Sequence, residues 1–194
     1  ARGRPPDPTA AAVLSLALGI GAYTAIYSLI DAVLLRQLPV PNPEQLLQIT
    51  TSDEGGDGYF TNPLWEEIRD RQSGFTSIAA FSETSVNAAD GGEVRPLRGL
   101  WASGDYFQLF GMKPAVGRLF FRADDVRGCP GMAVLGYGFW QSEYGGRGDV
   151  VGQPISISGK PLQIIGVANK GFSGPEVGRD VQLYMPLCAE AVVN

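Results

Sequence analysis

The run TAAAVLSLALGIGAYTAIYSLI, residues 9–30, decides how this chain is organised. It contains no charged residue. As a helix with about 1.5 Å of rise per residue it would extend roughly 33 Å, against about 30 Å for the hydrocarbon layer of a bilayer. Arg2 and Arg4 precede it, and Asp31 and Arg36 follow it. The run therefore predicts a membrane-spanning helix that anchors a water-soluble domain.

Two other interpretations compete for this apolar run. A cleaved signal peptide has an apolar core of about 7–15 residues followed by a small-residue cleavage site, whereas here apolar residues continue past Asp31 through 32–35. A core helix of a soluble protein is usually shorter and has a polar face. We favour the spanning helix, and its moderate hydrophobicity is typical of a helix that packs against other membrane helices.

Small residues line one face of the expected helix. Ala17, Gly21 and Ala25 lie four residues apart, a spacing that lets helix backbones approach closely in a membrane. The alternative is that Ala and Gly are simply common in membrane helices. The arginines at the N-terminus favour a cytoplasmic start and an extracytoplasmic domain, because positive charge is enriched on the cytoplasmic side.

The chain divides into four segments on this interpretation. Residues 1–8 form a cytoplasmic lead-in, and residues 9–38 form the transmembrane helix and its exit. Residues 39–45 contain Pro39, Pro41 and Pro43, which predict a stiff, extended connector because each proline disfavours helix at the preceding residue. Residues 46–194 form the extracytoplasmic domain.

This domain is expected to be a mixed α+β fold with mostly antiparallel strands, because strands and short helices alternate without regular βαβ spacing. We predict loops at 53–58 and 114–121 and side-chain caps from Asn62 and Ser103. The predicted strands are 46–50, 78–87, 93–101, 132–135, 150–157, 162–167 and 181–184. The predicted helices begin at Asn62 and end at Gly74, and cover 103–111 and 136–144.

Composition argues against several functions. The net charge is −5 and there is no histidine, which disfavours a nucleic-acid surface and removes the Ser-His-Asp triad and most zinc sites. Pro161 follows Gly159-Lys160 where a phosphate-binding loop needs Ser or Thr. We therefore expect no catalytic residue, no cofactor and no metal, and we interpret the acidic pairs at 66–67 and 124–125 as surface or loop residues.

Cys129 and Cys188 are the two cysteines of the chain. Outside the cytoplasm they could form a disulfide, but separation in sequence does not determine the distance between them. Two free thiols remain the alternative.

The order of several segments resembles the MacB/FtsX-type ABC transporter permeases with a MacB-like periplasmic core domain, especially the duplicated orphan permeases of the acidobacterial type. The resemblance begins with LALGIGAYTAIYSLIDAVLLRQLPVPNPEQL and continues through FTNPLWEEIRDR, GLWASGDYFQLFGMKPAVGRLF, VLGYGFWQSEYGG and VVGQPISISGKPLQIIGVANKGFSG to LYMPL. Residues that match recurrent family positions are Tyr106, Phe107, Gly111, Gly117, Arg118, Trp140, Gly152, Gly159, Gly166, Val167 and Pro186.

The resemblance implies a non-enzymatic permease subunit in a bacterial inner membrane, with its N-terminus in the cytoplasm and its main domain in the periplasm. It implies an ABC ATPase on a separate chain and further membrane helices, with a dimer as one arrangement. It also implies that this domain is incomplete, an N-terminal part. The expected role is efflux or mechanotransmission. The alternatives are a membrane-anchored extracytoplasmic binding or assembly domain without transport, and a secreted domain after a cleaved signal.

Overall fold

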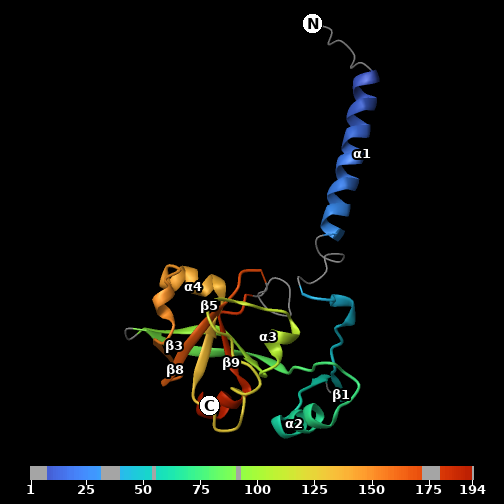
Figure 1. Cartoon of the computed structure of the whole chain (residues 1–194). Coiled ribbons are helices and arrows are strands. Elements are labelled where there is room, and N and C mark those ends of the chain that lie inside the picture. The colour runs from blue at the N-terminus through green and yellow to red at the C-terminus, as the bar shows by residue number, and fades with distance from the viewer. Residues whose placement is uncertain (1–7, 32–39, 54–55, 91–92, 172–179, 194) are drawn as a thin grey trace. The chain divides into compact units, whose positions relative to one another are not determined.

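The computed structural model describes residues 8–31, 40–53, 56–90, 93–171 and 180–193. It contains two compact units, Ala1–Leu38 and Pro39–Asn194. The first unit contains one continuous helix, α1 (Pro8–Ile30) (Figure 1). Length and composition make α1 suitable for crossing a membrane. The Thr24 hydroxyl donates to the carbonyl oxygen of Ile20 at 2.7 Å, so this polar group is satisfied within the helix.

The second unit is an α+β domain. Its strands are β1 (Thr51–Asp53), β2 (Gly56–Gly58), β3 (Phe81–Asp90), β4 (Glu93–Ala102), β5 (Pro114–Gly117), β6 (Met132–Leu135), β7 (Pro154–Ile157), β8 (Lys160–Ala168) and β9 (Leu183–Pro186). Its α-helices are α2 (Asn62–Arg71), α3 (Tyr106–Leu109), α4 (Tyr137–Tyr144) and α5 (Glu190–Val193). Single 3-10 turns occur at η2 (Pro43–Gln45), η3 (Gly148–Val150) and η4 (Leu187–Ala189).

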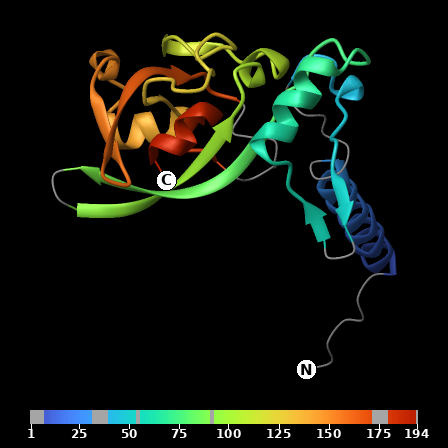
Figure 2. The same ribbon diagram turned by 90° about the horizontal axis from the view of Figure 1, so that it is seen from below.

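Seven strands form one sheet in the order β5-β8-β6-β9-β4-β3-β7. Because β7 also pairs with β8, six of these strands close into a ring, β8-β6-β9-β4-β3-β7. β5 pairs with the C-terminal part of β8 outside the ring. Figure 2 shows β3 and β4 as one long hairpin along this barrel. Two of the eight pairings among the described strands are parallel and six are antiparallel, which confirms the predicted mixed, mostly antiparallel α+β class.

Apolar periodicity explains how the barrel encloses its core. On β8, Leu162 and Ile164 are fully buried and alternate with exposed neighbours, the period of two that places one face of a strand inward. All four residues of β6 are buried, as expected of a strand covered on both faces. Phe139 and Trp140 of α4 join the same apolar cluster. The ring of strands and α4 therefore share one core. Burying each large aliphatic side chain in it contributes about 1.5–3 kcal/mol to stability.

The segment before α2 differs from the prediction. Residues 46–50 do not form a strand, whereas Asp53 and residues 56–58, predicted as parts of a loop, belong to β1 and β2, which pair with each other. Leu47 is 75% exposed. The apolar pattern of 46–50 was misleading because a strand needs a neighbouring strand to pair with, and none is paired with these residues.

The predicted helix caps were also wrong. Thr61, and not Asn62, occupies the N-cap of α2, and the Asn62 amide donates instead to Glu190 at 3.3 Å. Ser103 is buried and accepts the Ala80 backbone N–H at 3.0 Å, so it joins two chain segments and does not cap α3. Long-range partners therefore replace the local bonds that the sequence suggested. α2 also ends at Arg71, before the predicted Gly74.

Several element boundaries shift as well. Residues 114–117, predicted as part of a turn, form β5 because β8 offers an open edge to pair with. β3 begins at 81 and not 78, β7 begins at 154 and not 150, and β9 covers 183–186 and not 181–184. Helix 103–111 contracts to the single turn α3. Strands β4, β6 and β8 and helix α4 confirm the elements predicted at 93–101, 132–135, 162–167 and 136–144.

Candidate functional site

The described part of the proline-rich connector lies against the domain. Val40 is buried, with 9% of its surface exposed. Pro41 lies over Gly111, where an added Cβ would come within 2.6 Å of the Pro41 Cγ atom. Gly111 has φ +62°, a conformation that L side chains rarely adopt. The contact between Pro41 and Gly111 therefore tolerates no side chain at position 111.

The connector is not extended over residues 40–45, contrary to the prediction. Asn42 has φ 48° and ψ 57°, and Pro43 starts the 3-10 turn η2. Asn tolerates this left-handed conformation, and proline suits the first position of a turn or helix. Pro39 lies outside the described residues. The prolines therefore stiffen a bend rather than a straight rod.

A cluster of aromatic rings holds the surface on which the connector lies. Tyr106 and Phe110 lie 4.8 Å apart between ring centroids, and Phe107 contacts both Phe120 at 4.7 Å and Tyr184 at 5.3 Å. Burial raises the pKa of the Tyr106 and Tyr184 hydroxyls well above its ordinary value. Tyr184 lies on β9, so α3 is joined to the barrel through fully desolvated rings. We call Gly111 and α3 the connector platform.

The predicted helix-packing residues Ala17, Gly21 and Ala25 all lie on α1 and are exposed. A Cβ added to Gly21 would have no atom within 4 Å. Sequence reasoning identified the connector prolines but not the connector platform. The apolar Val40 between two prolines, and a glycine directly after an aromatic helical turn, were the available signals.

A cluster of polar residues lies in the loop between β5 and β6. Asp124 accepts two hydrogen bonds from the Arg118 guanidinium, at 2.6 and 2.9 Å, and a third from the Phe121 backbone N–H. The Arg118 hydrogen bond lowers the pKa of Asp124 below its ordinary value. Its neighbour Asp125 behaves oppositely, because burial raises the pKa of Asp125 despite two backbone N–H donors. These bonds give the loop structure, as expected for an acidic pair in a loop.

The same loop contacts α2 through exposed ion pairs. Glu66 accepts two hydrogen bonds from Arg127, at 3.1 and 2.6 Å, and this contact lowers the pKa of Glu66. Glu67 pairs with Arg71 within the same helix. The two glutamates therefore have different partners on the surface of the domain.

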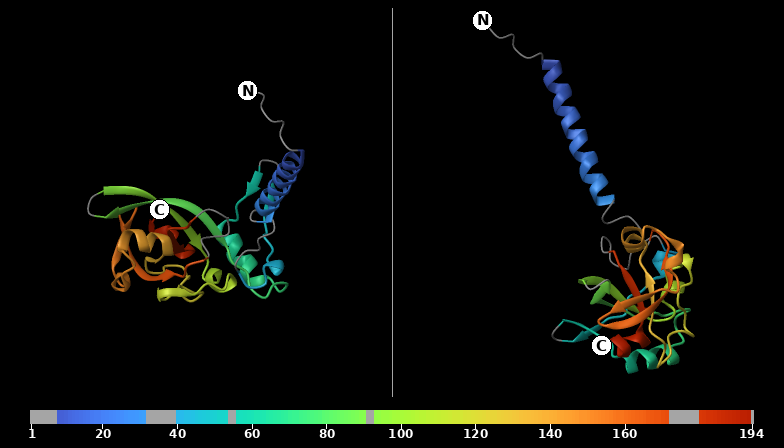
Figure 3. Two further views of the ribbon diagram at one scale, coloured as in Figure 1. Left: turned by 90° about the horizontal axis from the view of Figure 1, so that it is seen from above. Right: turned by 90° about the vertical axis from the view of Figure 1, so that its left-hand side faces the viewer.

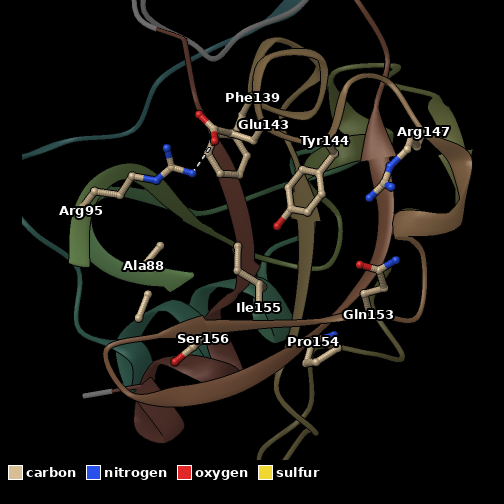
Figure 4. A pocket seen from close by; sticks show the side chains of 11 residues that line it. Ala88, Arg95, Phe139, Glu143, Tyr144, Arg147, Gln153, Pro154, Ile155 and Ser156 are labelled. Atoms are coloured by element: carbon tan, nitrogen blue, oxygen red, sulfur yellow. Dashed lines mark hydrogen bonds and ion pairs between the residues drawn. The ribbon is translucent and has the colours of Figure 1, made fainter. Parts of the chain in front are cut away.

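A pocket of about 240 Å³ lies between α4, the start of β7 and the end of β3. In Figure 4, Arg95 and Glu143 face each other on one side, and Arg147 and Gln153 lie on the other. Arg95 forms an ion pair with Glu143 and lies over the Phe139 ring, 5.8 Å from its centroid. Among the described residues, no group of three or more His, Cys, Asp or Glu side chains is arranged to hold a metal ion.

The fold and these contacts define a class: a small α+β barrel domain that follows an N-terminal helix of membrane-spanning length and is linked to it by a bent proline connector. Residues 9–193 match the family of the MacB-like periplasmic core domain. The chain belongs to this family, whose domain is part of ABC transporter permeases. This family and the N-terminal helix of membrane-spanning length together indicate a membrane-anchored chain with an extracytoplasmic domain.

Individual relatives are consistent with this family. Over 85 residues the chain is 32% identical to the pyoverdine export ATP-binding/permease protein PvdT of Pseudomonas syringae pv. tomato, covering 43% of this chain and 13% of that protein. In structure it is similar to the periplasmic region of MacB from Actinobacillus actinomycetemcomitans, with TM-score 0.50, 19% identity, and coverage of 61% of this chain and 51% of that one.

A further similar structure is the extracellular domain of the noncanonic ABC-type transporter YknZ from Gram-positive bacteria. Its TM-score is 0.51 and its identity is 18%, with 66% of this chain and 63% of that chain covered. The two structural likenesses show the fold. The chain spans 13% of the curated relative and between 51% and 63% of the two solved domains.

Proposed function

We propose that this chain is the N-terminal part of a permease subunit that performs no chemistry and transmits movement from membrane helices to its extracytoplasmic domain. ATP hydrolysis would take place on a separate cytoplasmic chain. PvdT is an ATP-binding/permease protein. Within residues 1–194 of this chain there is no phosphate-binding loop of the Walker A type.

The observation that carries this proposal is the contact between the connector and the connector platform. Val40 is buried and Pro41 lies on Gly111, which follows α3 in the chain, so a displacement of the connector's end would act first on Gly111 and α3. α3 in turn is joined to β9 by the Phe107–Tyr184 ring contact. Close-packed interiors transmit displacement because they contain little free volume. A displacement of residue 40 would therefore be transmitted to the barrel.

A flexible insertion tests this coupling. Four residues, Gly-Ser-Gly-Ser, are placed between Leu38 and Pro39 of the full-length protein, reconstituted with its ATPase. We expect ATP hydrolysis to continue and transport to fall by about tenfold or more, because a Gly/Ser chain behaves as a flexible coil and does not transmit force. The matched control carries the same four residues between Ser73 and Gly74, in the exposed segment after α2. Transport that persists with the connector insertion would overturn the proposal.

The second candidate is an extracytoplasmic binding or assembly domain without transport, and the pocket beside α4 favours it. The ion pair of Arg95 and Glu143 and the exposed Arg147 would suit a small polar ligand. The two candidates differ in their partners. Recovery of an ABC ATPase with the full-length protein from solubilised membranes would favour the permease, and its absence together with a full-length gene that encodes no further spans would favour the binding domain.

A further inference from the structure

One covalent bond joins two segments of the domain that are 59 residues apart. Cys129, in the loop between β5 and β6, forms a disulfide with Cys188 in η4. The sequence alone is compatible both with this pairing and with two free thiols. Cys129 is buried, with 5% of its surface exposed, and Cys188 is half-buried. The bond therefore fixes the loop after β5 to the segment after β9.

Helix α2 lies on both of these segments. Its Glu66 and Asp70 pair with Arg127 and Arg122 of the loop. Its Asn62 donates to Glu190 at the start of α5, and Figure 3 shows α2 beside α5 at the C-terminal end of the chain. Exposed ion pairs of this kind contribute about 0–1 kcal/mol each. Several weak bonds hold α2 only if the two segments that provide them stay together.

Asp125 also connects the loop after β5 to the segment after β9, through partly buried hydrogen bonds. One carboxylate oxygen accepts the Cys188 backbone N–H at 2.9 Å, and the other accepts the Gly104 N–H at 3.0 Å. Trp65 of α2 is buried, with 7% of its surface exposed. The disulfide, Asp125 and the ion pairs thus form one assembly, which we call the latch.

We propose that the Cys129–Cys188 pair is a site of thiol–disulfide exchange that controls whether α2 stays on the barrel. A dithiol reductant attacks the sulfur of Cys188, the more exposed of the two residues, and forms a mixed disulfide while Cys129 leaves as a thiolate and takes a proton. The second thiol of the reductant then displaces Cys188. Two electrons and two protons pass from the dithiol to the pair, and a disulfide oxidant reverses the reaction.

Reduction releases α2 without opening the barrel. The ring of six strands is closed by backbone pairing between strand residues, and the loop that carries Cys129 adds to it the bond from the Gln163 N–H to the Gly131 carbonyl oxygen, next to the start of β6. β6 and β8 are fully or largely buried within it. Local opening at the low-stability end of a domain is a general property of proteins. The latch operates whether or not the protein takes part in transport.

Hydrogen exchange on the whole chain in detergent tests this proposal. The oxidised protein is compared with the protein incubated with dithiothreitol, and with a Cys129→Ser/Cys188→Ser variant. We expect amides of 62–71 and 187–193 to exchange about tenfold faster in both reduced forms, while 132–135 and 160–168 keep their rates. Dithiothreitol should have no effect on the double variant.

Two results would overturn the latch. One is unchanged exchange of α2 after complete reduction of the pair, verified by thiol counting. The other is equal acceleration of α2, β6 and β8, which would make the disulfide a general staple of the whole domain. Because the dithiothreitol arm uses the wild-type chain, a double variant that fails to fold leaves the test intact.

Discussion

Two constraints favour glycine at position 111: the backbone conformation there and the space beside its Cα atom. Its φ of +62° disfavours any side chain, and Pro41 occupies the space into which a Cβ would point. Gly128 shares only the first constraint, because its φ is +80° and no atom lies within 4 Å of an added Cβ. The two glycines thus separate backbone strain from the contact with the connector.

Replacing each of these glycines by alanine separates the contribution of the Pro41 contact to the free energy of unfolding from that of backbone strain. Gly128→Ala should lower the free energy of unfolding by about 1 kcal/mol through the left-handed backbone alone. Gly111→Ala should cost about 2–3 kcal/mol, because strain and collision with Pro41 add. Chemical denaturation of both variants measures the difference. Equal losses would mean that Pro41 yields freely and that the connector is not held on the connector platform.

At the scale of single elements, α1 has a stripe of small residues. This stripe can act as a packing face only if another helix lies against it. Ala17, Gly21 and Ala25 share one face because residues four apart are neighbours on a helix. Gly19 lies nearly opposite Gly21 on the same helix, about 200° around the axis at 100° per residue. An added Cβ would have no atom within 4 Å at either glycine.

Substitution at these two glycines tests whether the stripe is a packing face. Gly21→Leu should weaken association of α1 with partner helices in a membrane by about fivefold or more, because helix–helix contacts there depend on close backbone approach. Gly19→Leu should leave association nearly unchanged. Energy transfer between labelled copies in vesicles, or copurification with the remaining helices of the full-length protein, provides the readout. Equal weakening of association by both substitutions would show that Ala17, Gly21 and Ala25 do not form a distinct packing face.

At the scale of the whole molecule, the disulfide bears on the compartment of the domain. Disulfides persist in oxidising compartments and are rare in the bacterial cytoplasm. The Cys129–Cys188 bond, the family and the arginines before α1 agree on an extracytoplasmic domain. We propose that α1 crosses the inner membrane with its N-terminus in the cytoplasm.

Labelling of single introduced cysteines tests this orientation. Ser73→Cys lies in the exposed segment after α2, and Gly3→Cys lies before α1 in the sequence. A membrane-impermeant maleimide applied to cells with a permeabilised outer layer should label position 73 and leave position 3 unlabelled until the inner membrane is broken. Labelling of position 3 in intact inner membranes would reverse the proposed orientation.

Features that depend on neighbours along the chain could be predicted from the sequence. The uncharged run of 9–30 predicted α1, and the ranges 132–135, 136–144 and 162–167 predicted β6, α4 and β8. In each case the deciding pattern is local, in the length and spacing of apolar residues along the chain.

Features that depend on distant partners could not be predicted from the sequence. Residues 46–50 have a strand-like pattern but no strand to pair with, whereas 114–117 became β5 because β8 offered an edge. Asn62 and Ser103 exchanged local caps for partners on other segments. The same is true of the connector platform under Pro41, the closure of the barrel by β7 and the pairing of Cys129 with Cys188. Each of these contacts joins residues far apart in the chain, and distance along the chain does not determine distance in space.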